Sequence, residues 1–139
     1  MGLLGSLFGW DQSMAAVNAV LAYQFITSCD QRQKALVTSQ IITIISSVQR
    51  KSSEQEVIRK FNTEQLLVQM NFVAIACDNL GIQPTVPNNV WTRISNPYSL
   101  ISKVTNYHID AALDAIKKQD GYSLTWPQTG NITFSIASL

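Results

Sequence analysis

The sequence predicts a mainly α, single-domain helical bundle with about four main helices, a short loop helix and a C-terminal β-hairpin. Apolar residues recur every three or four positions over most of residues 12–119, with capping and terminating residues between the runs. Residues 122–139 change to the alternating period of strands. A chain of 139 residues suits one domain with a core of its own. We therefore expect an apolar N-terminal segment at 1–10, a helical bundle at 11–121, and a hairpin at 122–139 that packs on the bundle or on a partner.

The N-terminal segment carries large apolar side chains at helical spacing, at Leu3, Leu4, Leu7, Phe8 and Trp10. Its glycines each lower helix stability by about 1 kcal/mol relative to alanine, so the segment needs a surface to lie against. That surface is the chain's own core, a partner groove or a lipid interface. No Lys or Arg precedes Arg32, so the segment lacks the cationic face that assists binding to anionic lipid, and we favour the partner over the lipid.

Two helices are predicted in the first third of the chain. The first runs from about 12 to 28, with an apolar stripe at Met14, Val17, Leu21, Phe25 and Cys29. The second runs from about 31 to 49, with Asp30 as its N-cap and Gln33 as the partner in a capping box. Its wide stripe, which consists of Val37, Ile41, Ile42, Ile44, Ile45 and Val48, predicts a helix covered on more than one side. No Gly or Pro separates the two helices, so one long kinked helix is an alternative.

A third helix is predicted from about 54 to 80. Ser53 and Glu56 form a capping box at its start, and Gly81 is a typical left-handed terminator at its end. A seam at steps of four and three is formed by Leu66, Met70, Val73, Cys77 and Leu80. The seam is too short for a sustained coiled coil and indicates packing within a bundle.

The remaining elements follow a loop at 81–95. Within that loop, Pro87 starts a short helix that carries Val90, Trp91 and Ile94. Asn96 and Pro97 form the N-cap and first position of the last helix, which extends to about 119 before Gly121. Its predicted core-facing stripe is Ile101, Val104, His108, Ala112 and Ala115. Alternating Tyr122, Leu124 and Trp126, then Ile132, Phe134 and Ile136, flank a turn-rich stretch and predict the β-hairpin, which is marginal unless it packs on something else.

Cysteine and histidine usage argues against a metal site. Two cysteines and one histidine cannot form a zinc quartet. We predict Cys29 and Cys77 as buried reduced thiols, with an inter-helix disulfide or a reactive thiol as alternatives. His108 is predicted as a core or interface histidine. No cofactor is expected.

Catalytic motifs are also missing from the sequence. It contains no G-x-S-x-G elbow, P-loop or dinucleotide fingerprint. Asp110 and Asp114 are followed within a turn by Lys117 and Lys118, so a solvated face explains them better than an acid/base pair. We therefore assign no catalytic residue and favour a non-enzyme.

The chain is poor in charge, which limits its function classes. Only 14% of the residues are charged and the formal net charge is +1, while Ser, Thr, Asn and Gln make up about a third of the chain. With 46% hydrophobic residues, this excludes a disordered polar chain, and it argues against nucleic acid as a partner. Uncharged stretches at 12–29, 35–49 and 65–77 are too polar or too short for typical membrane spans.

These observations favour a non-enzymatic helical protein–protein interaction module that self-associates as a homo-oligomer. Neutral polar surface costs less to desolvate than charged surface. The candidate interaction residues are Leu3, Leu4, Leu7, Phe8, Trp10, Trp126 and Phe134. Two alternatives are a peripheral or membrane-inserting helical protein that uses the N-terminal segment, and a small-ligand binder or enzyme with a pocket near His108, Trp91 and Tyr107. Without a recognisable export signal we expect a cytoplasmic location, with membrane association as an option.

Overall fold

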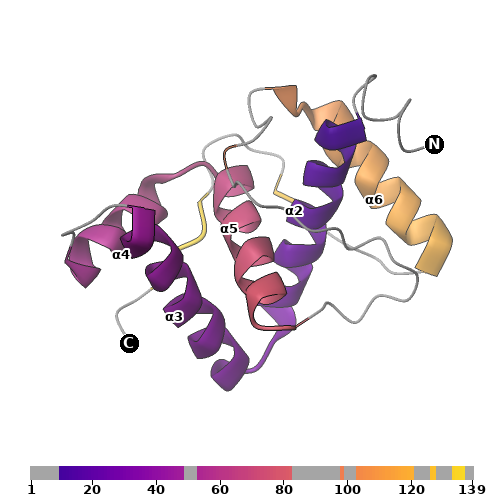
Figure 1. Ribbon diagram of the computed structural model, residues 1–139. Coiled ribbons are helices and arrows are strands. Elements are labelled where there is room, and N and C mark those ends of the chain that lie inside the picture. Colours follow the sequence, from indigo (N-terminus) through magenta and orange to yellow (C-terminus); the bar gives the residue numbers. More distant parts are fainter. Residues whose placement is uncertain are drawn as a thin grey trace.

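Five helices pack together in the computed structural model of the protein (Figure 1). The structure describes residues 10–48, 53–82, 98, 103–120, 126–127 and 133–136. The helices are α2 (Trp10–Ser28), α3 (Gln31–Val48), α4 (Glu54–Thr63), α5 (Leu66–Asn79) and α6 (Asn106–Asp120). The predicted N-terminal segment up to residue 9 and the predicted loop helix near Pro87 lie outside the described residues.

Helices α2 and α5 form the centre of the bundle. Helix α5 packs against α2 and α3, α2 also packs against α6, and α3 also packs against α4. Figure 1 accordingly shows the order α4, α3, α5, α2, α6 across the molecule. Every residue of α5 from 68 to 77 is buried, so the helix is covered on all sides. This position explains why residues 65–77 carry no charge, because an ionised side chain there would have to leave water.

Three predicted helix boundaries are confirmed. Asp30 caps α3, since its Oδ1 accepts a hydrogen bond from the Gln33 N–H at 2.8 Å. Ser53 caps α4, since its Oγ accepts from the Glu56 N–H at 3.2 Å. Gly81 follows α5 with a φ of 70°, the left-handed conformation that its lack of a Cβ allows. Because α2 ends at Ser28 and α3 begins at Gln31, the alternative of one long kinked helix is wrong.

The predicted third helix is two helices, which raises the number of main helices from four to five. The break lies at Glu64 (φ −73°, ψ 157°) and Gln65 (φ −62°, ψ 148°), both of which are extended. Helix α4 buries one face, at Val57, Ile58 and Phe61, whereas α5 is buried all round. The break lets α5 enter the centre of the bundle while α4 stays at its edge.

The last helix begins at Asn106, well after the predicted start at Pro97. Its first turn is organised by Thr105, whose carbonyl accepts from the His108 N–H at 3.0 Å and whose own N–H donates to His108 Nδ1 at 3.0 Å. The buried face contains Ile109, Ala112 and Ile116, while Ala115 is exposed. The predicted core-facing stripe was therefore correct at Ala112 and wrong at Ala115.

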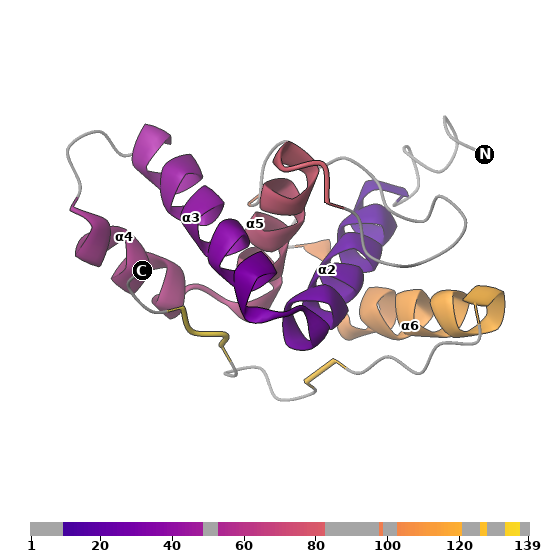
Figure 2. The same cartoon turned by 90° about the horizontal axis from the view of Figure 1, so that it is seen from below.

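The predicted β-hairpin is not supported, because the described residues 126–127 and 133–136 contain no strand. The predicted alternation itself is present: Phe134 is half-buried and Ile136 is buried, whereas Thr133 and Ser135 are exposed. The main chain of residues 134 and 136 bonds to side chains of α4 and α5 in place of a second strand. Figure 2 shows that residues 126–127 and 133–136 lie along one face of the bundle.

Candidate functional site

Two side-chain amides from neighbouring helices hold residues 133–136, which we call the C-terminal segment. Asn62 of α4 donates from Nδ2 to the Ile136 carbonyl at 3.0 Å, and its Oδ1 accepts from the Ile136 N–H at 2.9 Å. Gln69 of α5 donates from Nε2 to the Phe134 carbonyl, and its Oε1 accepts from the Phe134 N–H, both at 2.5 Å. We call Asn62 and Gln69 together the amide clamp.

The spacing of the bonded residues is that of a β-strand. In an extended chain, the N–H and C=O groups of alternate residues point to the same edge, where a neighbouring strand would pair with them. Phe134 and Ile136 are two positions apart and each bonds to one amide through both main-chain groups. The amide clamp therefore takes the place that a partner strand would occupy.

The break between α4 and α5 fixes the orientation of Gln69. Its Nε2 also donates to the carbonyl of Phe61 at 2.8 Å, and the same carbonyl accepts from the Glu64 N–H at 3.1 Å. Gln69 is fully buried (0% exposed), and burial of an unbonded amide costs several kcal/mol. Three hydrogen bonds, one to its own helical hairpin and two to the C-terminal segment, compensate that cost.

Two side chains of the C-terminal segment anchor it to the helices. Ile136 is 6% exposed and belongs to the same hydrophobic cluster as Val37 and Ile41 of α3 and Phe61 of α4. The half-buried ring of Phe134 receives the Lys34 ammonium of α3, with Nζ 5.4 Å from the ring centroid, within the range of a cation–π contact. The segment thus combines main-chain hydrogen bonds with one aliphatic and one aromatic anchor.

Trp126 packs on the same bundle. Its ring meets Tyr23 of α2 edge to face, with the centroids 5.6 Å apart, and it contacts both hydrophobic clusters. Of the predicted interaction residues, Trp126 and Phe134 therefore lie half-buried on their own chain. The structure places Trp10 as the first residue of α2, and its side chain lies outside the description, as do Leu3, Leu4, Leu7 and Phe8.

The alternative site near His108 is not brought together among the described residues. His108 Nδ1 takes part in the local cap with Thr105. Tyr107 is 77% exposed and its ring meets the His108 ring edge to face, with the centroids 5.9 Å apart. A side chain this exposed does not enclose a ligand, and Trp91 lies outside the described residues.

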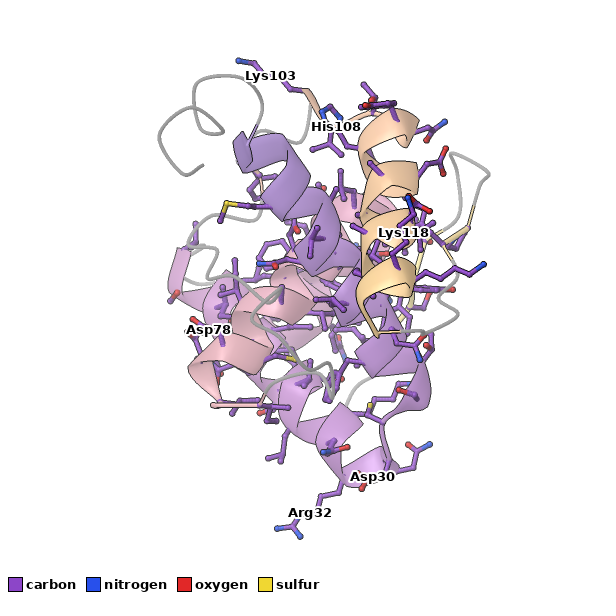
Figure 3. The ribbon with its side chains drawn as sticks, turned by 90° about the vertical axis from the view of Figure 1, so that its right-hand side faces the viewer. Asp30, Arg32, Asp78, Lys103, His108 and Lys118 are labelled. Atoms are coloured by element: carbon purple, nitrogen blue, oxygen red, sulfur yellow. The ribbon has the colours of Figure 1, made fainter. Side chains whose placement is uncertain are left out.

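The charged side chains do not gather into a catalytic or metal centre in the described part of the chain. Figure 3 shows Lys103 and His108 near one end of the molecule and Asp30 and Arg32 at the other. Asp114 and Lys118 form an exposed ion pair at 3.0 Å, as expected for a solvated face. No group of three His, Cys, Asp or Glu residues among the described positions is arranged to hold a metal ion.

Both cysteines are free thiols, Cys77 buried and Cys29 half-buried. Burial is the main cause that raises the pKa of Cys77 to about 12, with the negative charge of a Cys29 thiolate as a smaller cause. Burial also raises the pKa of Cys29. Because the thiolate is the reactive form, neither cysteine is set up as a nucleophile at neutral pH.

The sequence reasoning missed Asn62 and Gln69. A signal was present for Gln69, because this amide lies within the uncharged stretch 65–77 that the seam predicts to be buried. A buried amide requires hydrogen-bond partners, so its presence marks a polar contact inside the bundle. Asn62 carries no comparable signal, since the helix that contains it is otherwise amphipathic and rich in polar residues.

The function of this chain has to be inferred from the chemistry of its own residues. No protein-family model, curated protein or solved structure matches this chain. None of the helices in the described ranges is both long enough and apolar enough to cross a bilayer.

Proposed function

We propose that the chain is a non-enzymatic protein–protein interaction module, which binds an extended, apolar segment of a protein partner through the amide clamp. The observation that carries the proposal is the set of four hydrogen bonds between the side chains of Asn62 and Gln69 and the main chain of residues 134 and 136, two donated by each side. Main-chain groups are common to all peptides, so such bonds give affinity, and pockets for alternate side chains give selectivity. In this structure, the clamp is occupied by the C-terminal segment of the same chain.

The strength of these contacts suits reversible binding. Each hydrogen bond contributes about 0.5–1.5 kcal/mol net, and full burial of an aliphatic or aromatic side chain contributes about 1.5–3 kcal/mol. The four bonds, Ile136 and the half-buried Phe134 together give a gross stabilisation of several kcal/mol. These contributions sum to roughly 4–10 kcal/mol, and association costs at least about 4 kcal/mol. At most about 6 kcal/mol therefore remains, so a free peptide is expected to bind with a Kd of tens of micromolar at the tightest and of millimolar or weaker otherwise.

The composition of the segment fits a protein partner better than a charged ligand. Its exposed residues, Thr133 and Ser135, are neutral, and its half-buried Phe134 and buried Ile136 are apolar. Neutral hydroxyl side chains lose less on desolvation than charged ones. An extended segment with an aromatic residue, a small polar residue and a β-branched residue in succession is therefore the ligand class that we assign to the clamp.

A fluorescent peptide of residues 128–139 tests this function. The receptor is the full chain with Phe134→Ala and Ile136→Ala, which keeps the clamp and removes the side-chain anchors of its own segment. We expect the peptide to raise its fluorescence anisotropy on binding, and the additional change Asn62→Leu to weaken binding about tenfold or more, because two hydrogen bonds are lost.

Matched controls distinguish binding at the amide clamp from non-specific binding elsewhere on the chain. Asn79→Leu removes an exposed asparagine at the end of α5, away from the hydrogen bonds to the segment, and should leave peptide binding unchanged. A peptide with alanine at both anchor positions should bind weakly to every receptor. Equal binding of the native peptide to receptors with and without Asn62→Leu, both folded by circular dichroism, would refute the proposed function.

A further inference from the structure

We propose that the partner of the amide clamp is a second copy of this chain, and that two copies exchange residues 133–136. The C-terminal segment of each copy then binds the Asn62 and Gln69 side chains of the other. This inference rests on the proposed function, because it names the occupant of the same site. It also gives a structural route to the self-association that the charge-poor sequence led us to expect.

The contacts of the segment do not depend on which copy supplies it. Its hydrogen bonds join residues 65 and 74 positions apart in the chain, its Phe134 ring meets Lys34 of α3, which is still more distant in sequence, and its Ile136 belongs to the hydrophobic cluster of α3 and α4. The same segment from a second copy presents the same main-chain groups, the same Phe134 ring for Lys34 and the same Ile136 side chain. Exchange of an identical element between protomers is a low-cost route to dimers for this reason.

The segment is also a separable part of the fold. The described helices contact one another directly through α2–α5, α2–α6, α3–α5 and α3–α4 packing. Of the segment's residues, Ile136 alone is fully buried in the core. Withdrawal of the segment therefore exposes one buried aliphatic side chain and the two amides, while the helix–helix contacts are kept. Trp126 contacts the helices of its own chain and precedes the exchanged residues by seven positions.

Two copies can approach with little electrostatic cost. The formal net charge of the chain is only +1, and the C-terminal segment contains no charged residue. The charged group that meets the segment's aromatic ring is Lys34, whose contact with Phe134 is favourable. The segment of a second copy carries both anchor side chains, Phe134 and Ile136, so it already belongs to the ligand class that we assign to the clamp.

A pair of complementary variants isolates binding between copies. The first chain carries Phe134→Ala and Ile136→Ala, so it has an intact clamp and a defective segment. The second chain carries Asn62→Leu and Gln69→Met, so it has an intact segment and a defective clamp. The first chain keeps the main-chain groups of its own segment but lacks both anchors, and the second chain lacks the clamp, so only a mixture can bring an intact segment and an intact clamp together, and only between copies.

The expected result is a one-to-one complex in the mixture. With the first chain labelled, addition of the second should raise the anisotropy, and sedimentation velocity should show a species of twice the mass of one chain. Binding should be about tenfold weaker or more when the second chain also carries Phe134→Ala and Ile136→Ala. If Gln69→Met reduces the helical signal in circular dichroism, Asn62→Leu alone replaces the double change.

The outcomes distinguish the exchange from the function on which it rests. If the labelled first chain binds the peptide of residues 128–139 but not the second chain, the clamp binds segments and the exchange is refuted. If it binds neither the peptide nor the second chain, the proposed function and the exchange both fail. If the second chain binds equally well with and without its anchor residues, the copies associate through another surface and the exchange is again refuted.

Discussion

Replacement of Gln69 by methionine removes the central amide of the clamp while nearly keeping the size of the side chain. The amide makes three hydrogen bonds, one to the Phe61 carbonyl and two to the main chain of Phe134, in a position that is 0% exposed. At about 0.5–1.5 kcal/mol each, these bonds contribute about 3 kcal/mol. The Phe61 carbonyl keeps its bond from the Glu64 N–H, and methionine gains from apolar burial. We therefore expect the free energy of unfolding to fall by about 2 kcal/mol.

Urea denaturation followed by far-UV circular dichroism measures this loss. The transition midpoint should shift to lower urea with an unchanged m-value, since the surface exposed on unfolding is nearly the same. For a chain of 139 residues, a loss of about 2 kcal/mol corresponds to a fall in the thermal midpoint of about 7 °C.

The same substitution in a chain that ends at Thr133 shows whether the loss comes from the segment. Two of the three hydrogen-bond partners of Gln69 are then missing, and water reaches the amide. Gln69→Met should cost less than about 1 kcal/mol in that background. An equal cost in the full and the shortened chain would show that the amide does not hold the segment, and would refute the reasoning behind the clamp.

Three further predictions follow from local features. Gly81→Ala should lower the free energy of unfolding by about 1 kcal/mol in urea denaturation, because the φ of Gly81 is 70°. An added Cβ would meet nothing within 4 Å, so the cost comes from the backbone conformation alone. An unchanged free energy of unfolding would contradict this prediction. Partial desolvation of the 48% exposed Tyr98 phenol, then its hydrogen bond to Glu64 and the charge of Glu64, raise the pKa of Tyr98 from 10.0 to about 12. Because the folded state favours the neutral phenol, the contribution of Tyr98 to stability is complete below pH 10 and is lost as pH rises to about 12. Absorbance at 295 nm should show a late-titrating tyrosine component that Tyr98→Phe removes. In the native protein Cys29 should react with a thiol reagent before Cys77, which should wait for unfolding; equal rates would contradict the burial of Cys77.

Local signals allowed much of the helical organisation to be predicted. Asp30, Ser53 and Gly81 act through neighbours within a few residues, so their effect is visible in the sequence. The break at Glu64 and Gln65 was not predictable in this way, because neither residue disfavours a helix strongly. It arises from packing, since α5 is surrounded by the bundle and α4 is not. The predicted start of the last helix relied on the local signal of Asn96 and Pro97, whereas the helix begins at Asn106.

The contacts of the amide clamp were harder to predict from the sequence than the helix boundaries. Alternation at Phe134 and Ile136 predicted an extended segment with one buried side, and the burial pattern agrees. Alternation does not specify what bonds to the main chain, and the sequence reasoning supplied a second strand where the structure has side-chain amides. Contacts between residues more than sixty positions apart leave no local trace, apart from the amide of Gln69 in an apolar stretch.

The carbonyl of Phe61 gives the clamp a direction. Because it accepts one hydrogen bond from Gln69 Nε2, it holds the amide in one of its two orientations, with Oε1 and Nε2 in fixed places. A bound residue must then present its N–H to Oε1 and its carbonyl to Nε2, and a chain that runs the opposite way would present these groups in reverse order. The interruption between α4 and α5 thus sets the polarity, from N-terminus to C-terminus, of any segment that the clamp accepts.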